Sequence, residues 1–244
     1  MIMLDFTLQL SDPQLYNAHW NITYVMVFAW IFISVLGFQA GESLKYKITL
    51  ILVLLSFFQE VFDYYNRFFL SELYIVKIQT DLPLHLCHFA YWFSVLGMLA
   101  QVYNYKNKQF FFNCAYFLGF SGAFQGIVTV DLTGIFTFGD MLSLHLQHSL
   151  IILNVLWLIF AYGMKFNLKG VMQAFLFTNI LLIFVGIINT VIESNYMFLC
   201  KPPDVNNPFL IGDWPFYLII LELIFFIYGY FLCLPFLVVK FFKK

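Results

Sequence analysis

The sequence predicts an all-α fold, a polytopic transmembrane bundle of seven helices in a single domain covering residues 1–244. Of the 244 residues, 62% are hydrophobic and only 10% are charged, and so little polar surface does not cover a soluble domain. The apolar residues gather in segments of about 20, the length that crosses ~30 Å of hydrocarbon. We therefore expect a multi-pass protein of the cell membrane.

The predicted spans are joined by short connections. The two longest connections are residues 67–82 and 193–213, and the second contains Pro and Asn clusters, such as 206–208, that indicate turns. The second span is the weakest, because Glu60 and Asp63 lie near its end. In chain order the predicted spans cover residues 17–40, 46–66, 83–103, 109–130, 141–163, 170–192 and 214–239.

The basic residues predict the orientation of the bundle. Nine of the 12 Lys and Arg residues lie in the first, third and fifth connections and at the C-terminus, and the N-terminal tail has none. Because cytoplasmic segments are enriched in Lys and Arg, we expect the N-terminus outside and the C-terminus in the cytoplasm. The connection with Arg67 and Lys77 is the exception, since it lies on the predicted outer side. The N-terminal tail is expected to be exposed.

Small residues form a stripe along the fourth predicted span. They recur at intervals of three and four, so they share one face of the helix. Small residues at this spacing let helices approach closely in membranes. We therefore expect the fourth span to lie centrally in the bundle. The stripe consists of Ala115, Gly119, Gly122, Ala123 and Gly126.

Two short polar motifs interrupt apolar helices and are nearly identical. One is Leu-His-Leu-Cys-His at 84–88, and the other is Leu-His-Leu-Gln-His at 144–148. Ionisable groups inside lipid cost several kcal/mol unless they face a protein interior, so they mark candidate functional sites. The motifs hold four of the five histidines of the chain and one of its four cysteines: His85, Cys87, His88, His145 and His148.

The strongest polar residues of each span lie in its outer third under the predicted topology. The inner halves are almost bare, apart from Asn154 and Asn179. This asymmetry predicts one polar chamber that opens toward the outer leaflet, at the depth of lipid ester groups. It also argues against a transporter, which needs a polar path through both halves. Besides the two histidine motifs, the chamber is expected to contain Glu60, Gln125, Asn189 and Glu222.

One chemistry open to this chamber is acyl transfer on a thiol. Cys87 lies just past the predicted start of its helix, behind Pro83, and a helix N-terminus or a nearby histidine favours the thiolate. His148 is expected to reach Cys87 across the bundle. A cysteine with a histidine is a minimal pair for covalent catalysis. The spacing alone also fits an inert packing cysteine.

The histidines leave other interpretations open. His85 with His88, and His145 with His148, are each three residues apart on one helix face, so the two pairs are a candidate ligand set for zinc, copper, iron or haem. A non-enzymatic protein in which hydrogen bonds satisfy the histidines is another alternative. A disulfide between Cys87 and Cys200 is a further one. The remaining cysteines, Cys114 and Cys233, are predicted to pack in the interior.

Several longer motifs resemble a known family. The chain is similar to the YwaF-type integral membrane proteins of bacteria, which are related to a eukaryotic transmembrane acyltransferase of ether phospholipids and, more distantly, to the androgen-induced fatty-ester hydrolases. The resemblance runs from about residue 81 to 236. It rests on LPLHLC (82–87), GAFQGIVTVDL (122–132), QH (147–148), NYMFLCKPP (195–203) and WPFY (214–217).

The resemblance implies an enzyme acting on membrane phospholipids, an acyltransferase or acyl hydrolase with a thioester intermediate. The eukaryotic relative uses a cysteine in Pro-Cys-His and a histidine in Gln-His, which fall here on Cys87 and His148. The proline differs, because Pro83 lies four residues before the cysteine. We expect His85, Gln125 and Asn189 to position the substrate or the oxyanion. No cofactor and no nucleic-acid partner are expected.

Overall fold

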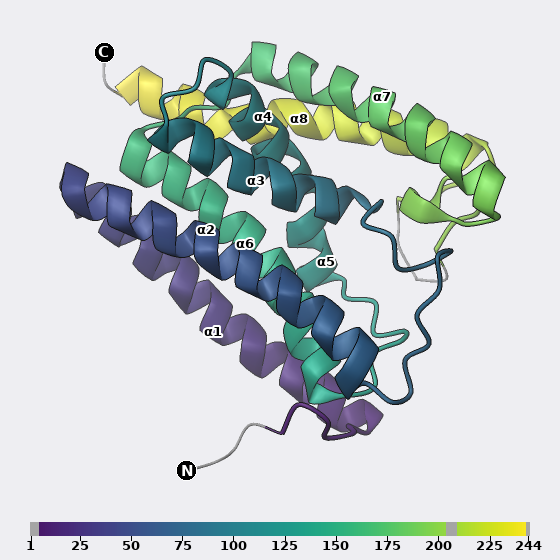
Figure 1. Ribbon diagram of the computed structural model, residues 1–244. Coiled ribbons are helices and arrows are strands. Elements are labelled where there is room, and N and C mark those ends of the chain that lie inside the picture. Colours follow the sequence, from purple (N-terminus) through teal and green to yellow (C-terminus); the bar gives the residue numbers. More distant parts are fainter. Residues whose placement is uncertain (1–4, 204–208, 243–244) are drawn as a thin grey trace.

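The computed structural model describes residues 5–203 and 209–242, with side chains up to 238, so residues 204–208 of the predicted 193–213 connection lie outside it. All of its regular elements are helices (Figure 1). η1 and η2 are π-helical and η3 is a 3-10 turn. In order they are α1 (Asp12–Gln39), α2 (Glu42–Tyr65), η1 (Asn66–Leu70), α3 (Leu86–Val102), α4 (Lys108–Leu118), η2 (Gly119–Ala123), α5 (Phe124–Val128), α6 (Phe138–Tyr162), α7 (Leu168–Ile192), η3 (Tyr196–Phe198) and α8 (Phe216–Phe242).

The helices follow the seven predicted spans, but α1 and α2 begin at Asp12 and Glu42, before the predicted 17 and 46, and α3 begins at Leu86, after the predicted 83. Within the described residues, six helical segments are long and apolar enough to cross a membrane, and α3 is a shorter apolar helix of 17 residues. The predicted start at Pro83 is wrong because His85 is the N-cap and has an extended backbone. Upstream, the Tyr196 hydroxyl accepts a hydrogen bond from the Leu82 N–H, at 2.8 Å, and holds this stretch outside the helix.

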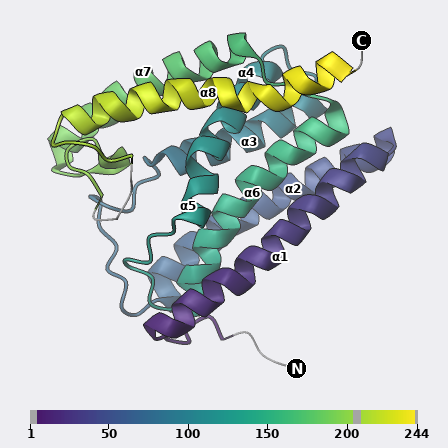
Figure 2. The same cartoon turned by 180° about the vertical axis from the view of Figure 1, so that it is seen from behind.

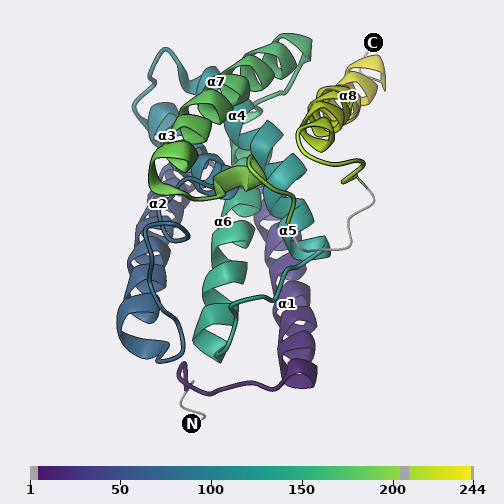
Figure 3. The same ribbon diagram turned by 90° about the vertical axis from the view of Figure 1, so that its right-hand side faces the viewer.

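The central helix of the bundle is α6. Of its most apolar 18 residues 67% are buried, against 61% for the segment α4–η2–α5 and 17–33% for α1, α2, α7 and α8. Figures 1 and 2 show α6 between α1 and α2 on one side and α3, α4 and α5 on the other. In Figure 3, α7 and α8 lie on the far side of α4 from α1. The fourth span, predicted to be central, thus shares the interior with α6.

Local sequence defines both ends of α6. At its start the Thr137 hydroxyl accepts a hydrogen bond from the Asp140 N–H at 3.1 Å, and the Asp140 carboxylate accepts one from the Thr137 N–H at 3.0 Å. This reciprocal pair satisfies N–H groups that a helix start leaves free. The helix ends at Gly163, whose φ of 67° suits glycine far better than residues with a β-carbon. These signals fix the positions of the histidines along α6.

The half of the bundle that the sequence predicts to be cytoplasmic is more polar than expected. The Asn154 amide donates hydrogen bonds to the hydroxyls of Ser56 and Ser94, at 3.2 and 3.0 Å, and the Trp157 N–H donates one to Thr49 at 2.8 Å. These bonds join α2, α3 and α6. The prediction of a nearly bare inner half missed them, because it gave no weight to serine and threonine hydroxyls.

The small-residue stripe packs only in part. Ala115, Gly119 and Ala123 are buried, and a β-carbon on Gly119 would lie 2.9 Å from Ile151 of α6. Gly122 has no atom within 4 Å of the place where its β-carbon would be. Close approach of α6 therefore explains Gly119, and it also explains Gly126, whose β-carbon would lie 3.0 Å from the His148 ring.

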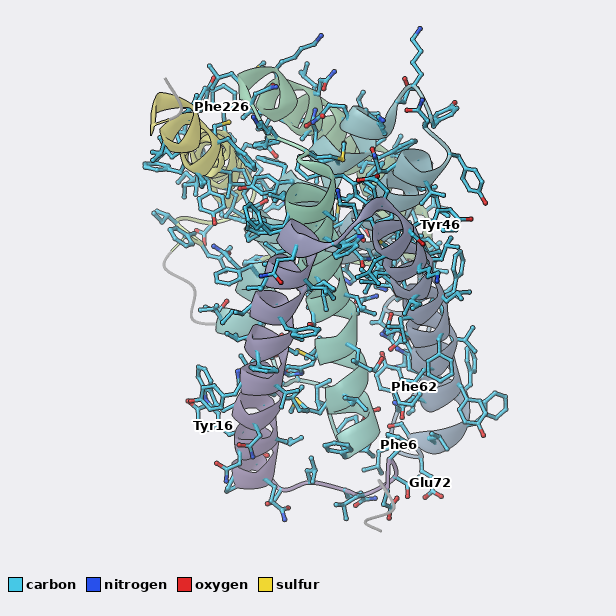
Figure 4. All side chains as sticks on the ribbon, turned by 90° about the vertical axis from the view of Figure 1, so that its left-hand side faces the viewer. Phe6, Tyr16, Tyr46, Phe62, Glu72 and Phe226 are labelled. Atoms are coloured by element: carbon cyan, nitrogen blue, oxygen red, sulfur yellow. The ribbon has the colours of Figure 1, made fainter. Side chains whose placement is uncertain are left out.

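The N-terminal segment is mostly exposed, as expected, at Asp5, Thr7, Leu8 and Gln9, but it is also bonded to the bundle. Backbone bonds link Leu10 to Phe136 and Phe138 to Leu8, at 3.1 and 3.0 Å. The ring of Phe6 lies 5.4 Å from that of Phe62 at the end of α2 (Figure 4). Residues 5–10 therefore cover the ends of α2 and α6.

Candidate functional site

The two ring nitrogens of His148 have different roles. Its Nδ1 lies 2.8 Å from the backbone oxygen of Leu144, one turn earlier in α6. A carbonyl oxygen only accepts hydrogen bonds, so Nδ1 carries the proton and Nε2 of the neutral ring keeps its lone pair. Nε2 faces Gly126 of α5, whose β-carbon, if present, would lie 3.0 Å away. Within the described residues, His148 thus has an acceptor nitrogen without a hydrogen-bond partner at the α5–α6 contact.

His145 is engaged on both sides of its ring. Its Nδ1 donates to the backbone oxygen of Met141 at 2.8 Å, and its Nε2 lies 2.8 Å from Nδ1 of His19. His19 must therefore donate to His145. Both histidines are 1% exposed. His19 was missed as a site residue, although it shares one face of α1 with the buried Leu15, Thr23, Met26 and Trp30.

Cys87 lies in the first turn of α3, directly after the N-cap His85 and Leu86. Its sulfur lies 3.8 Å from Nδ1 of His88. His85 accepts a hydrogen bond at Nδ1 from the Met197 N–H at 3.3 Å, which fixes this ring against η3. Free N–H groups and the positive end of the helix dipole stabilise a thiolate in a first turn. Cys87 thus lies at the end of α3 that presents free backbone N–H groups.

The two histidine motifs meet because α3 packs against α6. His88 and His148 are close enough for their charges to interact, and so are His148 and His145. Within the described part of the chain, the Cys87 sulfur has His88 as its hydrogen-bond neighbour and makes no such contact with His148. The five histidines form a series across three helices, in the order His85, His88, His148, His145 and His19.

Asn189 and Glu60 lie apart from this series. The Asn189 side chain donates to the Tyr196 oxygen at 2.9 Å and accepts from the Ser194 hydroxyl and the Tyr196 N–H, at 2.7 and 2.9 Å. Its amide is therefore used to fold the turn after α7. Glu60 interacts electrostatically with Asp63 and Arg67, and its buried Oε2 has no hydrogen-bond partner among the described residues.

Gln125 and Glu222 line two neighbouring cavities. Gln125 lies in one of about 230 Å³ between η2, α5 and α8. Glu222 lies in one of about 350 Å³ that also contains Leu86, the residue before Cys87. The structure thus brings Glu222 to the cavity next to the cysteine and Gln125 to the other one.

The four-histidine ligand set is not assembled. Across residues 5–203 and 209–242, no three His, Cys, Asp or Glu side chains are arranged to hold a metal ion. The reason is that His145 uses both of its ring nitrogens, toward Met141 and His19. All four cysteines are free, so the structure does not contain the Cys87–Cys200 disulfide considered above. Cys114 and Cys233 are buried, as predicted.

A charged cluster at the end of α2 was not predicted. The Arg67 guanidinium lies 3.0 Å from a carboxylate oxygen of Asp63 and 2.9 Å from one of Asp81. Burial opposes ionisation of Asp81, but hydrogen bonds from the Lys77 N–H, Tyr74, Thr80 and Arg67 outweigh it and lower the pKa of Asp81. Burial, together with the hydrogen bond to Asp81, raises the pKa of Tyr74 to about 12. Pairing with these two carboxylates explains how Arg67 is accommodated in a connection that the sequence predicts to lie outside, where basic residues are otherwise few.

A polar cavity of about 130 Å³ adjoins this cluster and the N-terminal part of α6. Its lining includes Arg67, Asp140 and Ser143, together with two buried amides, Asn66 and Gln147. Asn66 Oδ1 and Gln147 Nε2 have no hydrogen-bond partner among the described residues. A polar cavity of this size accommodates a few water molecules at ~30 Å³ each. From the two histidine motifs, Leu144 and Gln147 line this cavity but no histidine does, and Gln125 and Glu222 line two other cavities. The residues of the predicted polar chamber are therefore divided among separate cavities.

The fold and the site define a class of protein. It is a multi-pass helical membrane protein with a buried series of histidines and a cysteine at the start of a short helix. The profile of the TMEM164 family matches residues 14–233, which is most of the chain, and the protein belongs to this family. No curated protein and no solved structure matches the sequence significantly.

Proposed function

We propose that the protein is a lipid acyltransferase or acyl hydrolase of the cell membrane, with Cys87 as the nucleophile and His148 as the base. One observation carries the proposal. A cysteine in the first turn of α3 has an imidazole 3.8 Å from its sulfur, and α3 packs on α6, where Nε2 of His148 makes no hydrogen bond with the described residues. The resemblance to YwaF-type proteins and to the eukaryotic ether-phospholipid acyltransferase supports the same pair of residues.

The proposed reaction has two halves. In the first, His148 Nε2 takes the thiol proton, the thiolate attacks an ester carbonyl of a phospholipid, and the C–O bond breaks. The departing alcohol takes the proton back from His148, and the acyl group remains on Cys87 as a thioester. In the second half a lipid alcohol or water attacks the thioester, the C–S bond breaks, and the thiol is restored.

The sulfur must leave His88 to reach Nε2 of His148. Catalytic contacts are often long in a ligand-free enzyme and tighten when the substrate binds. In this proposal His88 holds the thiol before the reaction. His85 positions the start of α3 through Met197, and Asn189 positions the adjoining turn. Both residues therefore act on the site through the backbone.

A lipid-transfer assay with matched glycine variants tests this proposal. In liposomes with labelled phospholipid and an unlabelled lysolipid, His148→Gln is expected to slow acyl transfer by at least ~10², the contribution of a general base. Gly126→Ala is expected to reduce the rate as well, because its β-carbon would cover Nε2 of His148. Gly122→Ala is the control, since its β-carbon meets no atom within 4 Å. Equal rates in all four proteins would contradict the proposal.

A further inference from the structure

A cavity of about 350 Å³ lies between the first turn of α3, the middle of α7 and the N-terminal half of α8. Leu86 places one wall of it next to Cys87, and Met197 of η3 contributes to another. Most of its lining side chains are apolar, including Leu182 and Phe225. The cavity therefore suits an aliphatic chain, and its wall includes Leu86, the residue that precedes the proposed nucleophile.

Two polar side chains, Asn179 and Glu222, interrupt this apolar lining. The Asn179 amide nitrogen lies 3.0 Å from the Phe175 oxygen in its own helix and 3.0 Å from Oε2 of Glu222. Both amide hydrogens are therefore used. Oε1 of Glu222 has no hydrogen-bond partner among the described residues, so it is available to a ligand in the cavity. The third polar residue there, Thr178, donates to Ala174 within α7.

The free oxygen of Glu222 restricts what the cavity binds. A carboxylate oxygen accepts hydrogen bonds, so the ligand needs a donor at that place. The glycerol esters of a diacyl lipid offer only acceptors there, whereas a single-chain lipid has a free hydroxyl. A buried polar group left without a partner costs binding energy, which makes such sites selective against ligands that lack the donor.

We propose that Glu222, held by Asn179, is the specificity-determining residue of a subsite that binds a single-chain lipid through its free hydroxyl. The inference deepens the proposed function and rests on it, because this lipid is the alcohol that receives the acyl group from Cys87. The aliphatic chain occupies the cavity between α7 and α8. The hydroxyl donates to Oε1 of Glu222 and keeps its oxygen lone pairs for the attack on the thioester.

Binding is measured in the full-length Cys87→Ala protein, so the result does not depend on catalysis. The probes are a lysophosphatidylcholine, its 2-deoxy analogue and a diacyl phosphatidylcholine, each added to detergent-solubilised protein. With Glu222 present, the lysolipid is expected to bind at least ~10-fold more tightly than the deoxy analogue, as for one buried hydrogen bond to a charged group. Glu222→Met is expected to remove this preference and to leave binding of the deoxy analogue unchanged or stronger.

Two further variants separate ligand recognition from helix packing. Asn179→Leu removes the bond between α7 and α8 but keeps the Glu222 carboxylate, so the lysolipid preference should persist. Thr190→Ala changes an exposed hydroxyl of α7 that bonds to Gly186 within the helix, and it should match the parent protein. Equal binding of lysolipid and deoxy analogue in the parent, or equal weakening of both by Glu222→Met, would overturn the inference. The proposed function is tested separately, by a thioester on Cys87 of the unmutated protein. Failure of the binding test therefore contradicts the Glu222 subsite and not the proposed function.

Discussion

Cys87→Ala is expected to reduce lipid acyl transfer by at least ~10³-fold, to the background rate. The proposed reaction passes through a thioester on this sulfur, and removal of a nucleophile eliminates the whole covalent path. Folding should be nearly unaffected, because the side chain is half-buried and its side-chain contact with His88 is long, at 3.8 Å. The measurement is the rate at which labelled acyl chains move between phospholipids in liposomes.

Cys200→Ala is the matched control for this loss. Cys200 is also a free cysteine, it is exposed, and its bond to Asn195 uses the backbone N–H and not the thiol. Transfer at the parental rate is expected. If Cys87→Ala keeps its activity, or if Cys200→Ala loses it to the same extent, the assignment of the nucleophile is wrong.

The largest effect on stability is expected from Arg67→Met. The Arg67 guanidinium lies between the carboxylates of Asp63 and Asp81, whose side chains are 8% and 5% exposed. Removal of one partner from a buried ion pair leaves an uncompensated charge and costs about 3–5 kcal/mol. Ser143 also donates to Asp63, so the loss should spread to the start of α6. Denaturant titration in mixed micelles measures the free energy of unfolding.

Lys45→Met serves as the comparison for Arg67→Met. Lys45 pairs with Glu42 at 2.8 Å, but the Glu42 side chain is 86% exposed. An exposed pair contributes only about 0–1 kcal/mol, so little change is expected. A loss for Arg67→Met no larger than that for Lys45→Met would show that the cluster at the end of α2 does not stabilise the fold.

The same cluster predicts how acid affects stability. The pKa of Asp81 is lower in the folded protein than its ordinary value of 3.8. The ionised carboxylate therefore contributes stability above pH 3.8, and this contribution is lost as the pH falls through the lower, folded pKa. Between neutral pH and about 5, the contribution of Asp81 stays constant.

Composition and hydropathy predicted the helical segments well, because about 20 apolar residues have few alternatives in a membrane. The start of α3 was less predictable. Pro83 is suited to a first helical turn, yet the helix begins after His85. The cause is a long-range bond from Leu82 to the hydroxyl of Tyr196, which is 114 residues away in the sequence. Local patterns do not contain that information.

The sequence predicted the histidine motifs as the candidate site but not how their rings are used. Helical spacing put His145 and His148 on one face, an arrangement that is consistent both with a catalytic histidine and with metal binding. In the structure the ring nitrogens bind other partners: the backbone oxygens of Met141 and Leu144 accept from the two rings, and His19 of α1 bonds to His145. Asn189 was expected near an oxyanion, but its three hydrogen bonds fold a turn. Such pairings depend on how the helices pack.

The mass of the Cys87 peptide after brief incubation with phospholipid tests the central claim most directly. The protein is mixed with liposomes, quenched in acid and digested, and the peptides are analysed by mass spectrometry. Our account predicts one fatty-acyl group on Cys87 that neutral hydroxylamine removes, and none on Cys200. An unmodified Cys87 at times when labelled acyl chains have already moved between lipids would contradict it.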